Sequence, residues 1–232
     1  MSSHFCQKGG RRGADKVLAA ATIQLKKVTR KTGRVIDVAC GQYSSFLVTE
    51  SGQVIGFGLN NCYQMGYHDR EVRYAPEVIP IKDGDEDVKV KRIASGMHHT
   101  LFLSESGKFL FWKAHSKIYV FLGDVYTVGC GDYGRLGVGQ KDELRESKKA
   151  LKVTLPKPAI DVGCGSCTSY AILDDSTAMA WGMGSNLQLT NGSEDDEWEP
   201  IKMAGKQIDE KKILTVSGGG QHAILLIDAS ED

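Results

Sequence analysis

The stretch Gly129-Cys-Gly-Asp132-Tyr-Gly-Arg135-Leu-Gly137 decides the fold, because the chain contains three versions of it. The other two are Phe57-Gly-Leu-Asn-Asn61-Cys-Tyr63-Gln-Met-Gly66 and Trp181-Gly-Met-Gly-Ser-Asn-Leu-Gln188-Leu189. A second short pattern, a glycine preceded by small residues, stands before each version and once more near the end of the chain, at Gly41, Gly96, Gly165 and Gly219. Self-similarity of this kind is the sequence signature of a repeat architecture.

The four anchoring glycines are 55, 69 and 54 residues apart. The long interval arises because Tyr126-Thr-Val-Gly129 comes 16 residues later than the sister repeats predict, which places extra residues near Leu110–Val125. The period is therefore about 54 residues, with one insertion. Two origins of the insertion stay open: intron-derived sequence left in the gene model, or a genuine surface hairpin.

Each repeat contains four short runs with the signals of β-strands. In the first repeat they are Val35–Cys40, Ser45–Thr49, Val54–Gly58 and a run near Glu77–Ile81. Alternating apolar and polar residues bounded by Gly, Asn, Asp and Ser predict strands, and four antiparallel strands per repeat are typical of a propeller blade. We therefore expect an all-β partial propeller over residues 35–232. Its repeats are predicted at about 35–90, 91–158 with the insertion at 110–125, 159–212 and a partial 213–232.

Charge is unevenly distributed along a chain whose formal net charge is zero. Residues 7–34 carry nine basic side chains against one acidic, while residues 35–232 carry 20 basic and 28 acidic ones. A basic segment can attract an acidic partner, and a solvated surface loop is the alternative. No apolar run is long enough to span a bilayer and no secretory signal opens the chain. We therefore expect no membrane partner. Six scattered cysteines suit a reducing, intracellular location.

With the period and the C-G-x-x-H-T pattern at the anchoring glycines, the three stretches resemble the repeat of the regulator-of-chromosome-condensation family, G-x-N/D-x-x-x-Q/R-L-G. The resemblance covers nearly the whole chain. It implies the C-terminal half of a seven-bladed β-propeller, about four blades, that acts in the nucleus on chromatin as a guanine-nucleotide exchange factor for a Ran-type small GTPase. Such a factor makes and breaks no bonds, so we expect no catalytic residue, metal or cofactor.

The resemblance also implies which loops meet the GTPase. The implied contacts are Asn61, Tyr63, His98, His99, Asp132, Arg135 and His222. The repeat itself offers a different interpretation for two of them, because His99 and His222 occupy the position of Ser44 and Thr168. A hydrogen-bonding side chain that braces the blade is the alternative there.

The basic segment Phe5–Lys16 is similar to a loop that the family inserts to grip the acidic patch of the histone dimer on nucleosomes. The resemblance therefore implies nucleosome contacts by Lys8, Arg11, Arg12 and Lys16, and arginine suits carboxylates because its planar fork bonds them bidentately.

The chain departs from the family in lacking the other blades, with their basic tail and the β-wedge directed at the nucleotide site. It is therefore expected to be a fragment or the product of a faulty gene model. A non-catalytic module that docks on nucleosomes or another protein is the competing function. Open blade edges predict self-association.

Two motifs suggest other chemistry. The run Gly129–Gly134 spells G-x-G-x-x-G, but a dinucleotide site needs a helix to follow, and the same glycines recur as turn residues. Cys164 and Cys167 form a C-x-x-C pair without further zinc ligands at suitable spacing. Since Cys164 occupies the position of Cys40 and Ser95, we expect a small packed side chain there.

Overall fold

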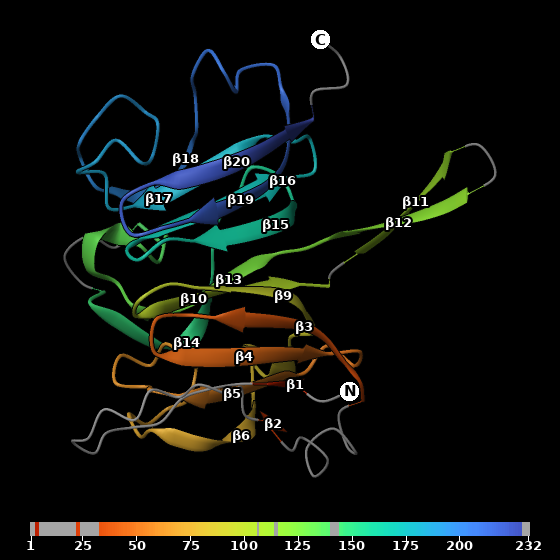
Figure 1. Ribbon diagram of the computed structural model, residues 1–232, viewed down its shortest axis with the longest axis vertical. Coiled ribbons are helices and arrows are strands. Elements are labelled where there is room, and N and C mark those ends of the chain that lie inside the picture. The colour runs from red at the N-terminus through yellow and green to blue at the C-terminus, as the bar shows by residue number, and fades with distance from the viewer. Residues whose placement is uncertain are drawn as a thin grey trace.

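Successive repeats fold into separate antiparallel sheets, in which strands that follow one another in the sequence lie side by side (Figure 1). The computed structural model describes the backbone of residues 3–4, 22–23, 33–105, 107–113, 116–139 and 144–228, and the side chains of 33–105, 123–139 and 144–228. The predicted all-β partial propeller is confirmed. The strands of these sheets are five to seven residues long. The second and third strands of each four-stranded sheet are buried on both faces, because the sheet is packed between its neighbours.

Three sheets have four strands and the last has two. The first sheet contains β3 (Val35–Cys40), β4 (Ser44–Thr49), β5 (Val54–Gly58) and β6 (Arg73–Ile79). The second contains β9 (Val90–Ser95), β10 (His99–Ser104), β13 (Val125–Cys130) and β14 (Glu146–Lys152). The third contains β15 (Ala159–Cys164), β16 (Thr168–Leu173), β17 (Ala178–Gly182) and β18 (Glu197–Lys202), and the last β19 (Lys212–Gly218) and β20 (Ala223–Asp228).

Shorter elements lie between the sheets and before them. They are the paired strands β1 (Ser3–His4) and β2 (Thr22–Ile23), β7 (Lys82–Asp83) and β8 (Glu86–Asp87), β11 (Gly107–Lys113) and β12 (Ser116–Leu122), and a 3-10 turn η1 (Asp132–Gly134). The basic residues expected to bind nucleosomes, Lys8, Arg11, Arg12 and Lys16, lie outside the described residues.

The anchoring glycines join one sheet to the next at the end of the inner strands. Gln42 N donates to Gly96 O at 3.1 Å, and Ser166 N donates to Gly219 O at 3.0 Å. A Cβ atom on Gly96 would lie 2.4 Å from Gly165 O. The backbones of neighbouring sheets therefore approach too closely for a side chain, which explains why the sequence keeps glycine at this position.

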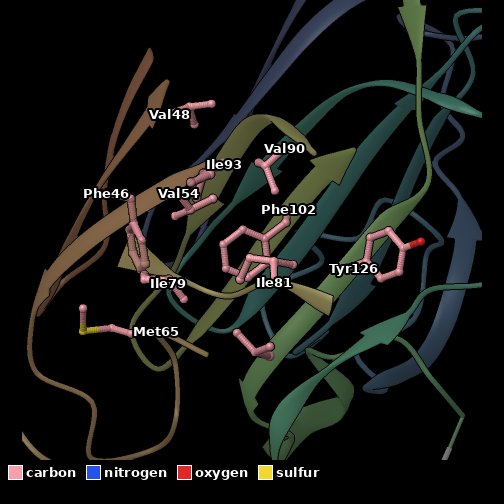
Figure 2. Close-up of a cluster of buried hydrophobic side chains, with 11 residues drawn as sticks. Phe46, Val48, Val54, Met65, Ile79, Ile81, Val90, Ile93, Phe102 and Tyr126 are labelled. Carbon is pink, nitrogen blue, oxygen red and sulfur yellow. The ribbon is translucent and has the colours of Figure 1, made fainter. Parts of the chain in front are cut away.

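Apolar side chains fill the space between neighbouring sheets. In the first interface Phe46 and Val48 of β4 pack against Ile93 of β9 and Phe102 of β10 (Figure 2). The rings of Phe46 and Phe102 meet edge to face with their centroids 6.4 Å apart, a favoured arrangement of aromatic rings. Two further clusters fill the interfaces between the second and third sheets and between the third and last.

The extra residues of the second repeat form the β11–β12 hairpin, which projects from the body of the protein (Figure 1). The predicted bounds, Leu110–Val125, were wrong at the C-terminal end. Val125 is fully buried, begins β13 and pairs with Leu103 of β10. Gly123 instead makes the link to the next sheet, exchanging two hydrogen bonds of 2.9 Å with Ala159, much as Gly52 O accepts from Val90 N in the first repeat.

Deleting Gly107–Leu122, which is the whole hairpin, is expected to preserve the fold and to raise the free energy of unfolding by about 1 kcal/mol. The deletion joins Ser106 to Gly123 and leaves the turn Glu-Ser-Gly-Asp, the length of the turn Glu50–Gln53 in the first repeat. Shortening a loop about fivefold lowers its closure entropy by roughly that amount. Urea unfolding followed by circular dichroism measures the change, and loss of the cooperative transition would show that the hairpin supports the fold.

Candidate partner-binding surface

The loops that contain the two recurring sequence motifs lie at the same end of every sheet. The loop from β3 to β4 and the loop from β5 to β6 lie at the same end of the first sheet, because the strands are antiparallel, and Leu59 N donates to Tyr43 O between them at 2.9 Å. The equivalent loops of the other sheets adjoin through the anchoring glycines. These loops together form one face of the propeller, which we call the loop face.

The long loops have the same backbone conformation in three repeats. Tyr63, Gly134 and Leu187 occupy one repeat position and all have left-handed φ angles, of 59°, 77° and 56°. Three residues later Gly66 N, Gly137 N and Thr190 N donate to the carbonyls of those residues at 2.8, 2.9 and 3.0 Å. A left-handed φ is uncommon for tyrosine and leucine, so the repeated turn positions these side chains despite its backbone cost.

Tyr43 and His98 occupy the same position in the first and second repeats and stack on each other. Their ring centroids are 5.4 Å apart at an interplanar angle of 27°. Tyr43 is exposed and His98 half-buried. Burial and the nearby Arg135 guanidinium lower the pKa of His98, which favours the neutral imidazole at physiological pH. The pair forms an aromatic platform on the loop face between two blades.

His99 braces two blades and does not reach the surface. It is fully buried, and its Nε2 lies 2.9 Å from Ser169 Oγ in the third sheet. Ser169 Oγ in turn donates to Arg135 O at 2.8 Å, so His99 Nε2 carries the proton of the shared bond. Burial lowers the pKa of His99 to about 3. The bracing interpretation is confirmed for His99, and direct partner contact by this side chain does not fit the structure.

Arg135 is also buried, against the expectation that it lies exposed on the loop face. It is 3% exposed, its Nε donates to Asp132 O at 2.8 Å, and its carbonyl accepts from Trp181 Nε1 at 3.1 Å. Gln64 and Gln188 fill the same repeat position and are equally buried. Each of these glutamines accepts from the backbone N–H two residues before it. The position therefore stabilises the loop from beneath.

Asp132 lies on the surface above Arg135. Its carboxylate accepts from Cys130 Sγ at 3.1 Å, and burial raises the pKa of that thiol to about 11. Next to it Tyr133 is 46% exposed and its ring faces the Arg135 guanidinium, 5.3 Å from the ring centroid. The second repeat therefore presents a carboxylate and an aromatic ring side by side, held by a buried cation.

Asn61 and Tyr63 lie on the loop of the first repeat. Asn61 is exposed and its Oδ1 accepts from Gln64 Nε2 at 3.1 Å. The guanidinium of Arg70 lies over the Tyr63 ring, 4.9 Å from its centroid, and forms an ion pair with Glu146 of the second sheet. These contacts fix the orientation of the tyrosine on the loop face.

His222 lies at the open C-terminal end of the loop face. It occupies the repeat position of His99, yet it is exposed, because no described sheet follows the last one to cover it. Five of the predicted contacts, Asn61, Tyr63, His98, Asp132 and His222, are therefore accessible or half-buried on this face. Sequence reasoning missed Tyr43 and Tyr133, although Tyr43 shares the repeat position of His98.

Within the described residues, no group of three His, Cys, Asp or Glu side chains could hold a metal ion. Cys164 and Cys167 both have free thiols, and burial raises the pKa of Cys164 strongly. Gly129–Gly134 forms a strand end and a 3-10 turn, which offers no long helix for a dinucleotide. The described residues contain no helix long and apolar enough to cross a membrane.

Four-stranded antiparallel sheets that follow one another around shared inner glycines, with their loops gathered on one face, define a repeat protein of the β-propeller class. Comparison with known families gives a more specific assignment. The Regulator of chromosome condensation (RCC1) repeat matches residues 35–64, 51–103, 123–172 and 178–226. The chain belongs to the regulator of chromosome condensation repeat family.

Individual relatives and solved structures agree with this assignment. The chain is 36% identical to Regulator of chromosome condensation of Xenopus laevis, over 96% of the chain and 48% of the relative. It is 34% identical to the human protein of that name, over 98% of the chain and 50% of the relative. The chain thus spans about half the length of these relatives. The fold matches Prp20p of Saccharomyces cerevisiae, a protein described with its binding to Gsp1p and histones, at a TM-score of 0.66 and 24% identity over 85% of the chain and 45% of Prp20p.

Proposed function

We propose that this chain acts as a guanine-nucleotide exchange factor, or as part of one, for a Ran-type small GTPase on chromatin in the nucleus. The observation that carries the proposal is the loop face, on which aromatic and polar side chains of successive repeats are held in place by stacking, cation–π contacts and hydrogen bonds with neighbouring residues. Family membership and the binding of Prp20p to Gsp1p and histones support it.

The GTPase would contact the exposed or half-buried residues Tyr43, Asn61, Tyr63, His98, Asp132 and His222. His99 and Arg135 would contribute indirectly, because both are buried and hold in place the loops that carry the contact residues. Aromatic side chains are frequent among residues that dominate binding energy, which favours the Tyr43–His98 platform as the centre of the contact. The basic residues Lys8, Arg11, Arg12 and Lys16 would bind the nucleosome.

Exchange of this kind needs no bond chemistry. The factor binds the nucleotide-free GTPase more tightly than the loaded form, and this differential affinity shifts the population toward nucleotide release. Reversing a two-state population from 1:99 to 99:1 requires about 5.5 kcal/mol of such preference. A second candidate, a module that binds without catalysing exchange, is favoured by the fact that the chain spans only about half the length of its relatives.

Release of a fluorescent guanine nucleotide from a Ran-type GTPase tests both candidates. The purified chain is expected to stimulate release, and His98→Ala is expected to reduce the stimulation about tenfold or more, because the platform loses one of its rings. Asp174→Ala is the matched control, since Asp174 is exposed in the turn between β16 and β17 at the opposite end of the sheets, and it should leave the stimulation unchanged.

The possible outcomes separate the two functions. Background release together with binding to the nucleotide-free GTPase would assign the chain to the non-catalytic module. Neither release nor binding would refute a GTPase partner for the loop face. Stimulated release that is insensitive to His98→Ala would move the contact away from the platform.

A further inference from the structure

A groove lies at the outer rim of the molecule, at the junction of the first two sheets. The outer strand β14 of the second sheet runs beside β7, which follows the first sheet. The groove has a volume of about 330 Å³, which is within the range of small-ligand sites. Its lining contains four titratable residues, and all four are basic: His68, Lys82, Lys148 and Lys149.

A bulge in β14 brings two consecutive lysines to the groove. The three residues 148–150 lie opposite the single residue Val128 of β13. Ser147 holds the bulge, because its Oγ donates to Lys149 O at 2.7 Å and accepts from Lys149 N at 3.3 Å. Neighbouring residues of a regular strand point to opposite faces, whereas a bulge changes the direction of its side chains. Both lysines therefore line the same groove.

The other two four-stranded sheets have the same bulge without the lysines. Their outer strands β6 and β18 also place three residues opposite one residue of the neighbouring strand. These residues are Tyr-Ala-Pro at 74–76 and Trp-Glu-Pro at 198–200, where the second sheet has Lys-Lys-Ala at 148–150. The backbone of the bulge therefore does not require lysine, and the positive charge needs another explanation.

Trp198 closes the equivalent junction between the second and third sheets. Gly139, the repeat equivalent of His68, donates through its N to Trp198 O at 2.9 Å. A Cβ atom on Gly139 would lie 2.5 Å from Glu199 Oε1. The cavity that Trp198 and Gly139 line has a volume of only about 10 Å³, which is room for about one water molecule. The junction that has Lys148 in place of Trp198 is the open one.

The charge of the groove is poorly neutralised by the chain itself. Within the described residues, Lys148 and Lys149 form no ion pair, and both are exposed. Lys82 pairs with Asp87 at 3.9 Å, but both side chains are more than half exposed, so this pair contributes little. Asp69, which follows His68, is paired with Arg73. A cleft lined by charges of one sign attracts ligands of the opposite sign.

We propose that this groove binds a phosphate-bearing ligand with at least two negative charges. The ammonium group of lysine is a compact point charge with three donors, and it is a common ligand of phosphates. The described lining contains no arginine, whose planar fork suits carboxylates. The volume has room for a small organic phosphate or for one phosphorylated side chain. The inference does not rest on the GTPase, because none of the proposed GTPase contacts lines the groove.

Isothermal titration calorimetry with inorganic pyrophosphate tests the proposal on the full chain. We expect binding that Lys148→Ala/Lys149→Ala weakens about tenfold, because two of the four cations are removed. Lys148→Trp/Lys149→Glu installs the residues that the third sheet has at the equivalent positions, and it is expected to abolish binding because the indole fills the groove. Circular dichroism should show that both variants are folded, since the two lysines are exposed.

Lys202→Ala/Lys206→Ala is the matched control. It removes the same charge from exposed positions of the third repeat outside the groove, and it should leave the affinity unchanged. A serine-phosphorylated peptide distinguishes the source of the phosphate. Tighter binding of the peptide than of pyrophosphate would assign the groove to a modified protein partner, and the reverse order would assign it to a small organic phosphate. No binding of either probe, or binding that both groove variants retain, would overturn the proposal.

Discussion

Replacing Trp181 by alanine is expected to lower the free energy of unfolding by about 4 kcal/mol, the usual cost of removing a large buried aromatic side chain. Trp181 is fully buried in the cluster shared by the second and third sheets. Its Nε1 donates to Arg135 O at 3.1 Å, and a Cβ atom on Gly137 would lie 2.5 Å from that nitrogen. The indole of the third sheet therefore supports a loop of the second repeat. Alanine would leave a cavity and would remove one of the two side-chain hydrogen bonds that Arg135 O accepts, the other coming from Ser169 Oγ.

Guanidinium unfolding followed by far-ultraviolet circular dichroism measures this loss, and the melting temperature should fall by about 10 °C for a chain of this size. Trp181→Phe is the matched control. It keeps most of the ring and loses the N–H donor, so we expect a cost of about 1–2 kcal/mol. A Trp181→Ala variant within about 1 kcal/mol of the native chain would show that the loop and the third sheet are not coupled through the indole.

The repeat could be predicted from sequence because its positions are constrained by backbone geometry. Gly58, Gly129 and Gly182 have φ angles of 117°, 109° and 107°, which favour glycine, and the anchoring glycines leave no room for a side chain. Each constraint acts on a single position, so it can be recognised in the sequence as a recurring glycine. The strands are predicted from the alternating residues between these glycines, and the order of the sheets follows from the repeat period.

The accessibility of the candidate contacts could not be predicted in the same way. The family resemblance suggested that Arg135 contacts a partner from a loop at the blade edge. Its burial depends on the neighbouring blade, which contributes the Ser169 hydroxyl and the Trp181 indole. A signal did exist, since the uncharged Gln64 and Gln188 fill the same position. The bounds of the insertion were ambiguous for a different reason. A glycine stands at each end of it, Gly107 and Gly123, and either could match the turn glycine Gly52 of the first repeat. The hydrogen bonds between Gly123 and Ala159 show that Gly123 is the equivalent residue.

Replacing Asp161 by alanine is expected to lower the free energy of unfolding by about 3 kcal/mol, because a buried carboxylate joins three sheets. Asp161 on β15 is 3% exposed. One carboxylate oxygen receives Arg92 Nη1 of the second sheet at 2.8 Å, and the other accepts from Thr215 Oγ1 of the last sheet at 2.5 Å. The Arg92 side chain is 46% exposed, so water replaces part of its interaction. The larger part of the cost comes from the buried hydrogen bonds that the Asp161 carboxylate accepts, because their donors lose a partner that water cannot fully replace.

Asp37 provides a matched control for this prediction. It occupies the same repeat position in the first sheet, and its Oδ1 accepts from Val38 N at 2.9 Å just as Asp161 Oδ1 accepts from Val162 N at 2.8 Å. Because Asp37 is half-buried and the described contacts give it no role between sheets, Asp37→Ala should cost about 0.5 kcal/mol. Equal losses at both positions in urea unfolding would trace the effect to the local turn. A larger loss at Asp161, non-additive with Arg92→Ala, would establish that the ion pair couples neighbouring blades.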